Sequence, residues 1–403
     1  MGYNGAMENS CRRRVFLKEN EEDRLQRGEF WVYDNEIASN LEDFSPGEIV
    51  TVVNAAGRYI ATGYINPFST ITVRVLTRDE NEPIDRAFFH RRIADALGQR
   101  QAIDPDNIYY RLVYGEADFL PGLVVDRFAD SFIVQITTAG MEQCKEDIFA
   151  VIRELFAAAV IIEKSLTTSR EKERLPTINR VITAGGSSSR KIEINGVRFA
   201  VDFLKSQKTG FFLDQRENYL LLRHIARGRH VLDAFAYAGA WGLHAYRCGA
   251  KSVEFLEISS EYLEQARLNV ELNGFPLADF SFVREDAIKL LKQMDQQGIK
   301  KDLVILDPPA FVKSKAKLKE ALRGYKEINL RALKMLTPGG FLVTCSCSHF
   351  LARDEFIHVV YSAASDARRR IKLIEFKTQP YDHSVLLPLF QSEYLKCALF
   401  YVY

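Results

Sequence analysis

The sequence has no long apolar run. None of its apolar stretches approaches the ~18 residues that a membrane-spanning helix needs. The N-terminal region becomes charged at Arg12-Arg13-Arg14 without the apolar stretch that a signal peptide requires. We therefore expect a cytoplasmic protein that makes no contact with a membrane.

Cysteine is scarce, and neither sign of charge is in excess. The 403 residues contain 6 cysteines, and no Cys-x-x-Cys pair occurs among them. This argues against a zinc site and predicts a protein without a bound metal. Lysine and arginine number 54 against 53 acidic residues. A uniformly basic nucleic-acid binder is therefore excluded, whereas local basic patches are not.

Two glycine-rich phosphate-binding motifs are also missing. The chain has neither a Gly-x-Gly-x-x-Gly element after a strand nor the lysine motif of a P-loop. The first absence argues against NAD or FAD, whose pyrophosphate needs close approach of the backbone. The second argues against an NTPase.

What the sequence does contain is three parts of different character. Residues 1–82 have the pattern of a small β domain, and residues 83–190 that of a small α/β domain in which we expect the polar segment 167–190 to form a long loop. In residues 191–403, apolar strands alternate with helical stretches, which predicts an α/β fold with an open, doubly wound, mostly parallel sheet. The expected strands of this sheet are 230–235, 252–257, 280–283, 303–307, 341–346, 372–376 and 394–402.

A cofactor site is expected at one edge of this sheet. Its first strand runs into a glycine turn at Gly239, and carboxylates follow later strands at Glu257, Asp286 and Asp307. Ligands of open α/β sheets bind beyond such strand ends. Carboxylates suit S-adenosylmethionine, which carries a sulfonium, an ammonium and a ribose diol but no phosphate; the alternative is that each is an ordinary turn or helix N-cap. The cofactor-binding candidates are Asp233, Phe235, Gly239, Glu257, Asp286, Ala287 and Asp307.

Cys347 and Asp307 are the catalytic candidates. Asp307 leads into a stiff Pro-Pro turn, and Cys347 follows the next strand. Carbon 5 of cytosine or uracil is a poor nucleophile until a thiolate adds at carbon 6, so a thiol here suits carbon-5 methylation. Asp307 would hold the protonated ring nitrogen and stabilise the adduct, and the basic segment after it would supply positive potential to the thiol. We expect Cys345 to be a buried packing residue, which is the alternative for any cysteine on an apolar strand.

At these motifs the chain resembles the RlmI family, bacterial cytosine-5 methyltransferases of large-subunit ribosomal RNA. The resemblance covers the whole chain. It rests on Lys208-Thr-Gly-Phe-Phe-Leu-Asp-Gln-Arg216, Gly115–Asp126, Asp307-Pro-Pro-Ala-Phe-Val, Arg323–Asn329 and Ser346-Cys-Ser348.

This resemblance implies an N-terminal PUA domain, a small α/β middle domain and a class I methyltransferase domain. It implies S-adenosylmethionine as cofactor, ribosomal RNA as substrate and Cys347 as nucleophile. It further implies that Asp214, Gln215 and Arg216 support the cofactor pocket. In the larger group of RNA cytosine-5 methyltransferases a second cysteine follows the Pro-rich turn, and that position is Ala310 here.

Local basic segments are the expected RNA contacts, because phosphate recognition needs only such patches. Lysines alternate along the segment after Asp307, and arginines cluster near the N-terminus. The alternative is a solvated charged surface. The RNA-binding candidates are Lys313, Lys315, Lys317, Arg12 and Arg13.

Two other functions stay open. One is methylation of an amine or ring nitrogen of a base, for which an Asp-Pro-Pro turn can orient the amino group and no cysteine is needed. The other is a non-catalytic, RNA-binding ribosome assembly factor. A homodimer is also considered.

Overall fold

The computed structural model describes residues 12–157, 159–311, 317–387, 389 and 392–403. It divides into two compact units, which are treated separately. The first comprises Met1–Arg190, Asp202–Leu213 and Tyr381–Phe390, and the second comprises Lys191–Val201, Asp214–Pro380 and Gln391–Tyr403.

The N-terminal part of the first unit is a five-stranded sheet with the order β1-β3-β4-β5-β2. Antiparallel hairpins join β3, β4 and β5, as the alternation of apolar residues predicts. Its core is apolar and includes Val15, Val32, Val50 and Val73. The elements are β1 (Arg14–Phe16), α1 (Asp23–Gln26), β2 (Trp31–Tyr33), β3 (Glu48–Val53), β4 (Tyr59–Ile65) and β5 (Ile71–Thr77).

A second five-stranded sheet, with the order β10-β9-β8-β7-β6, follows in the same unit. Its core also contains Tyr64 of β4 and Leu76 of β5, so the two sheets of this unit share buried side chains. The elements are α2 (Arg86–Ile103), β6 (Tyr109–Tyr114), β7 (Leu123–Phe128), β8 (Ser131–Ile136), α3 (Ala139–Gln143), α4 (Lys145–Leu155), β9 (Val160–Ser165), α5 (Thr168–Lys172) and β10 (Ile178–Val181).

The expectation of a long loop at residues 167–190 is wrong. This segment contains α5 and the edge strand β10, which pairs antiparallel with β9 from Ile178 opposite Ser165 to Val181 opposite Ile162. The central residues of β10, Asn179 and Arg180, are exposed. An exposed edge strand therefore carries no apolar alternation, which is why the sequence did not reveal it.

The second unit is built on a seven-stranded sheet with the order β15-β14-β13-β16-β17-β19-β18. Only β19 runs antiparallel to its neighbours, β17 and β18. The predicted doubly wound sheet is confirmed. Its elements are β13 (His230–Ala234), α7 (Ala240–Arg247), β14 (Ser252–Glu257), α8 (Ser260–Leu272), β15 (Phe280–Arg284), α9 (Ala287–Gln296), β16 (Lys301–Leu306), α10 (Leu318–Met335), β17 (Leu336–Ser346), α11 (Arg353–Asp366), β18 (Ile371–Lys377) and β19 (Lys396–Val402). The hairpin β11 (Ser189–Ile194) and β12 (Val197–Asp202) and the short helix α6 (Leu222–Ile225) precede them.

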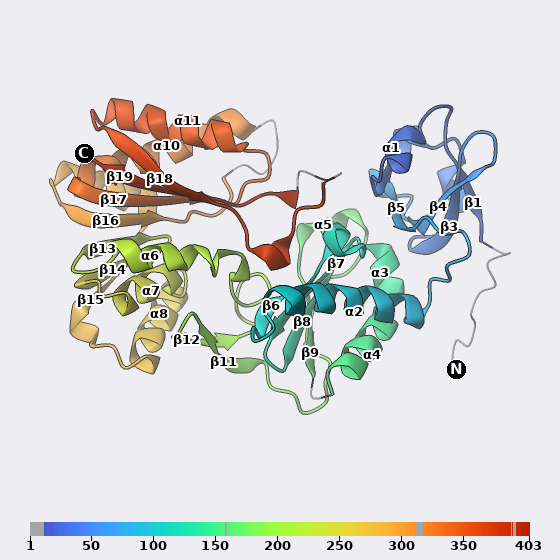
Figure 1. Ribbon diagram of the computed structural model, residues 1–403, viewed down its shortest axis with the longest axis horizontal. Coiled ribbons are helices and arrows are strands. Elements are labelled where there is room, and N and C mark those ends of the chain that lie inside the picture. The colour runs from blue at the N-terminus through green and yellow to red at the C-terminus, as the bar shows by residue number, and fades with distance from the viewer. Residues whose placement is uncertain (1–11, 158, 312–316, 388, 390–391) are drawn as a thin grey trace. The chain divides into compact units, whose positions relative to one another are not determined.

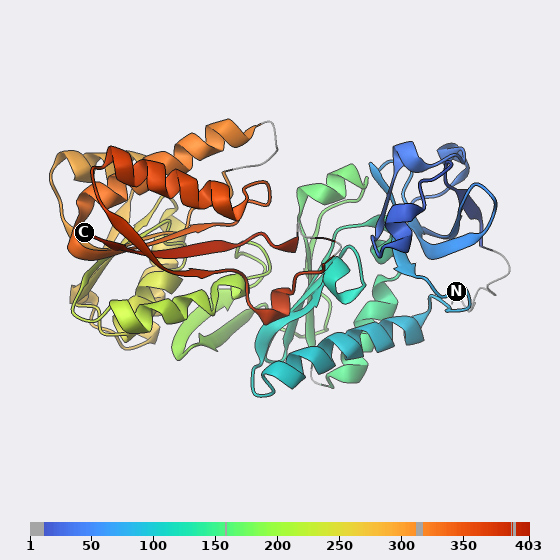
Figure 2. The ribbon, with the colours of Figure 1, turned by 45° about the horizontal axis from the view of Figure 1, so that its top comes forward.

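Helices cover both faces of this sheet. Figures 1 and 2 show α10 and α11 side by side on one face and α7 and α8 on the other. The central strands are apolar over nearly their whole length, because helices bury both of their faces. The strand order reverses between β13 and β16, so the carboxyl ends of these two strands flank the place where open α/β sheets bind ligands.

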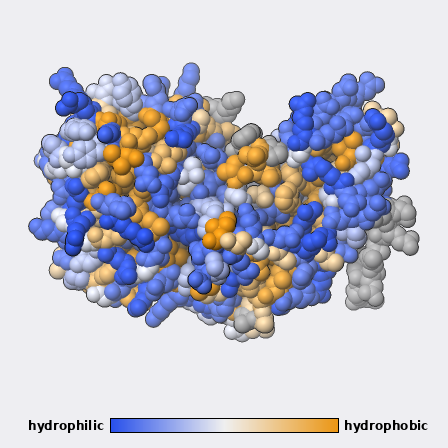
Figure 3. All heavy atoms as spheres, in the orientation of Figure 1, coloured by the Kyte–Doolittle hydropathy of each residue, from blue (hydrophilic) through white to orange (hydrophobic). Residues whose placement is uncertain are grey.

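β18 is an edge strand that leaves apolar side chains exposed. Leu373 is 40% exposed and Ile374 is 51% exposed, and apolar atoms gather on this side of the molecule in Figure 3. Lys372 and Lys377 lie on the same strand. Lysines on an edge strand discourage pairing with strands of other molecules.

Close packing between α7 and β14 depends on Gly242. A methyl group at this position would lie 2.3 Å from Cε1 of Phe255 and 2.6 Å from Cγ1 of Val253. Gly242 therefore lets the first helix after β13 approach the sheet, which fixes the helix N-terminus beside the predicted cofactor site.

Gly242→Ala is expected to destabilise the protein by about 1–3 kcal/mol, because overpacking forces neighbouring groups apart. Gly98→Ala is the control, since Gly98 in α2 has no atom within 4 Å of an added methyl; it should stabilise by roughly 0.5–1 kcal/mol. Denaturant unfolding followed by circular dichroism measures both. An unchanged unfolding midpoint for Gly242→Ala would contradict the packing argument.

Candidate active site

The loop between β13 and α7 has an unusual backbone. Phe235, Tyr237 and Gly239 all lie in the left-handed region, with φ of 68°, 48° and 82°. Two of these residues carry side chains, for which this region is unfavourable. Such strain persists only where surrounding contacts hold it, and it gathers at functional sites.

Glu257 and Asn269 hold this loop. Glu257 lies at the end of β14, and its Oε2 accepts a hydrogen bond of 2.9 Å from the backbone N–H of Tyr237. Its Oε1 accepts from the N–H groups of Ile258 and Ser259. The Nδ2 of Asn269, a fully buried residue of α8, donates to the carbonyl of Ala238 at 3.0 Å. Glu257 is thus at the position that the sequence predicted, and its carboxylate is anchored by backbone amides.

Asp233 is completely buried beneath the same loop. Its Oδ2 accepts a hydrogen bond of 2.8 Å from the backbone N–H of Gly242, while its Oδ1 has no partner among the described residues. Burial raises the pKa of Asp233 to about 8; the Gly242 N–H opposes this shift, and the charges of Asp307 and Glu257 add to it. A cationic ligand nearby would offset the repulsion between these carboxylates.

Asp307 follows β16 and joins three elements. Its Oδ2 accepts hydrogen bonds from Nε2 of Gln215 at 3.0 Å and from Nε1 of Trp241 at 2.9 Å. Trp241 is in the first turn of α7, and Tyr219 packs edge-on against it at 4.9 Å. Asp307 is therefore oriented by a buried amide and a buried indole rather than exposed as a loop carboxylate.

Gln215, from the predicted support segment, donates to Asp307, and its Oε1 accepts from Nδ2 of Asn218 at 2.7 Å. Asp214 instead accepts from the hydroxyl of Tyr394 at 2.7 Å. Arg216 is buried, with its guanidinium 3.5 Å from the carboxylate of Glu217.

Asp286 acts as the N-cap of α9. It is exposed, and its Oδ1 accepts from the backbone N–H of Lys289 at 2.9 Å, which is the alternative that the sequence left open. Ala287, the next residue, is buried. A role of either residue in cofactor binding stays a prediction.

The two neighbouring cysteines have different surroundings. Cys345, within β17, is completely buried opposite Cys397 of β19, and burial raises its pKa well above the ordinary value. Cys347 lies just beyond the end of β17 and is partly exposed. Only Cys347 is therefore accessible to a substrate, and Cys345 is buried as expected.

Tyr325 of α10 braces the segment that carries Cys347. Its hydroxyl accepts from Oγ of Ser346 at 2.8 Å and lies 3.0 Å from Oγ of Ser348. Burial raises the pKa of Tyr325, so its hydroxyl stays neutral. Tyr325 comes from the Arg323–Asn329 motif, and this contact gives that motif a physical role.

The predicted RNA contacts differ in their surroundings. Lys313 and Lys315 lie outside the described residues, and Lys317 is exposed just before α10. Arg13 forms an ion pair with Glu48, and its guanidinium lies 4.9 Å from the ring centre of Phe44. Arg12 instead lines a cavity of about 310 Å³ on the first sheet, together with Arg14, Tyr59 and Glu80.

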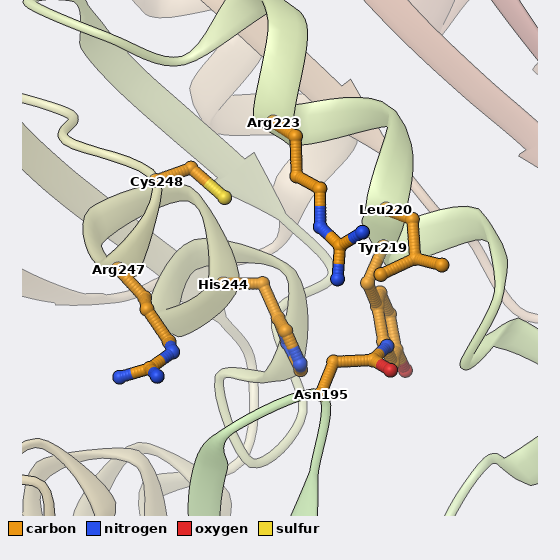
Figure 4. A pocket seen from close by; sticks show the side chains of 7 residues that line it. All are labelled: Asn195, Tyr219, Leu220, Arg223, His244, Arg247 and Cys248. Atoms are coloured by element: carbon orange, nitrogen blue, oxygen red, sulfur yellow. The ribbon is translucent and has the colours of Figure 1, made fainter.

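A second cavity, of about 300 Å³, lies at the far end of α7. It is lined by Asn195, Tyr219, Leu220, Arg223, His244, Arg247 and Cys248, and Figure 4 shows Arg223, His244 and Asn195 directed toward a common space. Burial lowers the pKa of His244 to about 4, so this histidine is neutral. The cavity is lined by the second half of α7, whereas the predicted cofactor loop precedes this helix.

Sequence reasoning missed several residues of the site. Asn269, Trp241 and Tyr325 act through hydrogen bonds to the loop, to Asp307 and to the Cys347 segment. Ile258, directly after Glu257, is 63% exposed, which the sequence alone does not reveal.

Comparisons with known proteins agree with this geometry. A family model described as S-adenosylmethionine-dependent methyltransferase matches residues 179–381, and one described as PUA-like domain matches residues 15–78. A protein of Shewanella amazonensis is 39% identical over 95% of this chain and 98% of its own length. A protein of Klebsiella pneumoniae is 37% identical over 95% of this chain and 96% of its own length. Both are named ribosomal RNA large subunit methyltransferase I.

The chain belongs to the ribosomal RNA large subunit methyltransferase I family. Its fold is that of a class I methyltransferase sheet with an N-terminal PUA-like domain, and its cofactor is S-adenosylmethionine. A Streptococcus mutans protein assigned as a SAM-dependent methyltransferase shares this fold, with a TM-score of 0.82 at 19% identity over 96% of this chain and all of that chain. A methyltransferase solved in complex with SAH gives a TM-score of 0.83 at 18% identity over 96% of this chain and 100% of that chain.

The donor set around β13 fits a cationic cofactor. Asp233, Glu257 and Asp307 come from neighbouring strand ends, and no phosphate-binding loop accompanies them. Within the described ranges, no helix is long and apolar enough to cross a membrane. The residues that the structure describes also contain no group of three or more His, Cys, Asp or Glu side chains that could hold a metal ion.

Asp233→Asn is expected to change the pH dependence of stability. Because the folded pKa of about 8 exceeds the ordinary 3.8, the folded protein holds a proton between these pH values that the unfolded chain has lost. The contribution of Asp233 to stability therefore falls as pH rises from about 4 to about 8 and is constant above it. Asparagine mimics the protonated acid and does not titrate.

Unfolding free energies measured between pH 5 and pH 8 test this. The free energy of unfolding of Asp233→Asn minus that of the natural protein should increase across this range by more than about 1.4 kcal/mol, the equivalent of one pKa unit. Parallel curves for the two proteins would contradict the raised pKa.

Proposed function

We propose that this protein methylates carbon 5 of a cytosine in large-subunit ribosomal RNA. The substrate class follows from the names of its relatives. The position on the base is supported by one observation above all, the accessible thiol of Cys347 at the carboxyl edge of the catalytic sheet. A thiol is needed for carbon-5 chemistry and not for methylation of an amine.

In this reaction the thiolate of Cys347 adds to carbon 6 of the cytosine. The electron pair of the 5,6 double bond then makes carbon 5 nucleophilic, and carbon 5 takes the methyl group that S-adenosylmethionine supplies from its sulfonium. A base then removes the carbon-5 proton, and Cys347 departs from carbon 6 as the thiolate, which restores the aromatic ring. Asp307, held by Gln215 and Trp241, would hold the protonated ring nitrogen and stabilise the adduct.

The cofactor would lie against the strained loop after β13. In this proposal Glu257 accepts hydrogen bonds from the ribose hydroxyls, Asp233 and Asp307 face the cationic part, and Ile258 contacts the adenine. Gly239 and Phe235 supply the backbone turn that admits the cofactor. Asp233 would ionise when a cation binds, because an opposite charge favours the charged form.

Methylation of an amine or ring nitrogen is the second candidate. In that chemistry an aromatic residue after the Asp-Pro-Pro turn would position the base. Here Phe311 packs against Tyr325 at 4.8 Å and belongs to the periphery of the hydrophobic core. This favours the carbon-5 reaction. A non-catalytic assembly factor is disfavoured by the organised carboxylates of the site.

The domain boundaries at 82 and 190, the cytoplasmic location and the homodimer stay predictions. Removing residues 1–82 would not give a clean test of the N-terminal domain. Tyr64 packs against Gly140, and its hydroxyl donates to the carbonyl of Pro121 at 2.7 Å. Deletion would therefore expose the core of the second sheet, so point substitutions are preferable.

Cys347→Ala is expected to abolish turnover while leaving S-adenosylmethionine affinity unchanged, since the thiol acts on the base. RNA carrying 5-fluorocytosine should form a covalent complex with the natural enzyme, because fluorine cannot leave as the carbon-5 proton does. Mass spectrometry of the trapped complex identifies the attachment site. Cys345→Ala, two residues away and buried, is the control and should keep most of the activity. Near-normal turnover by Cys347→Ala would favour nitrogen methylation.

Arg12→Ala combined with Arg14→Ala should raise the Michaelis constant for RNA about tenfold and reduce its salt dependence, because phosphate contacts release counterions. Calorimetry should give an unchanged affinity for S-adenosylmethionine. Arg27→Ala is the matched control, since this arginine lies on the same domain with its side chain 81% exposed. Its guanidinium is 3.8 Å from the carboxylate of Asp23, so little structure depends on it. Equal effects of the double variant and the control would remove the Arg12 cavity from RNA binding.

A further inference from the structure

Lys396 is a buried cation beside the Cys347 segment. It begins β19 and lies opposite Ser346 in the pairing of β17 with β19. The residue is only 4% exposed. Its Nζ donates hydrogen bonds of 2.8 Å to the carbonyl of Ser348 and of 2.8 Å to the carbonyl of Leu351. These two carbonyls belong to the turn that directly follows Cys347.

The hydrogen-bond partners of the ammonium within the described residues include no acidic group. Among the residues that the structure describes, Lys396 forms no ion pair, and both of its acceptors are neutral carbonyls. Buried charges in proteins are normally paired, because desolvation of an isolated charge costs several kcal/mol. The charge of a Cys347 thiolate would act on Lys396, and so would that of Glu393.

We propose that Lys396 is a positioning residue which shapes the turn after Cys347 and stabilises the thiolate form of this cysteine. The inference rests on the proposed role of Cys347 as nucleophile. A cation close to a thiol favours the thiolate, which is the reactive species. Lys396 would thus do what the sequence analysis assigned to the basic segment after Asp307.

Among the described residues near Cys347, the tyrosine and the carboxylates supply no positive charge. Tyr325 of α10 interacts electrostatically with the Cys347 thiol, but its hydroxyl stays neutral because burial raises its pKa. Asp307 at the end of β16 and Glu393 before β19 are acidic, and His349 stacks on Tyr394 at 5.1 Å. Burial lowers the pKa of Lys396 to about 8, so most Lys396 side chains are charged at pH 7.

The chain offers a matched control in Lys164. This lysine is 2% exposed, and its Nζ also donates to two backbone carbonyls, those of Phe203 and Ser206. Burial lowers its pKa to about 8 as well. Lys164 lies in the other structural unit, so its removal imposes the same kind of structural loss without changing the charge near Cys347.

The experiment measures the rate at which iodoacetamide alkylates Cys347 as a function of pH, read from the Cys347 peptide by mass spectrometry. Lys396→Met should raise the midpoint of the pH profile by one unit or more and slow alkylation at pH 7 about tenfold. Lys164→Met should behave as the natural protein does. An unshifted midpoint in folded Lys396→Met, or an equal shift in Lys164→Met, would overturn the proposal.

Two further measurements complete the test. The kcat of Lys396→Met for RNA methylation should fall at pH 7 and recover at higher pH, whereas the affinity for S-adenosylmethionine stays unchanged. If Lys396→Met does not fold, the pH profile of Cys347 alkylation in the natural protein tests the proposal instead. A Cys347 midpoint below the ordinary ~8.5 supports the proposal, and one at or above it overturns the proposal. Because alkylation needs no RNA, it tests Lys396 even if Cys347→Ala proves active and the carbon-5 mechanism fails.

Discussion

The Asp307 carboxylate is the contact on which the catalytic unit depends. One of its oxygens accepts hydrogen bonds from Gln215, which precedes the sheet, and from Trp241 in the first turn of α7. Asp307 itself ends β16, beside β13 in the parallel sheet. The entrance segment, the first helix and the central strands are therefore fixed relative to one carboxylate. The same group would face both the cofactor and the target base.

Charge is distributed unevenly around this contact. Asp233, Glu257 and Asp307 bring carboxylates to one place, and their mutual repulsion contributes to the raised pKa of Asp233. Such an arrangement is costly in an empty site and favourable when a cation binds. Beside the Cys347 segment the described residues include a buried lysine, Lys396. The carboxylates suit a sulfonium cofactor, and Lys396 would suit the thiolate that we propose.

The central strands could be predicted from the sequence, because strands buried on both faces are apolar runs bounded by turns. The expected strand 252–257 coincides with β14. Edge strand β10 could not be predicted, since its four residues are too few to show an alternation and the central two, Asn179 and Arg180, are polar. The strand-end rule placed Glu257 and Asp307 where β14 and β16 end, as the structure does, while their roles toward the cofactor stay predictions. The close packing of Gly242 against Phe255 could not be predicted, because it joins residues of two elements.

The supporting residues of the site escaped prediction for a different reason. Lys396 is 48 residues from Ser348, Asn269 is 31 from Ala238, and Tyr325 is 23 from Ser348. Each is an ordinary helix or strand residue in its own neighbourhood, and its role arises only when the sheet brings distant segments together. Local sequence patterns reveal the side chains at strand ends, but not the distant side chains that orient those residues.

The most direct test of carbon-5 methylation is the identity of the modified nucleoside. Unmodified large-subunit ribosomal RNA is incubated with the enzyme and S-adenosylmethionine carrying a labelled methyl group, and the digested nucleosides are separated and identified by mass spectrometry. Label in 5-methylcytidine is the result that the account predicts. Label in a nucleoside methylated on nitrogen, with none in 5-methylcytidine, would contradict it.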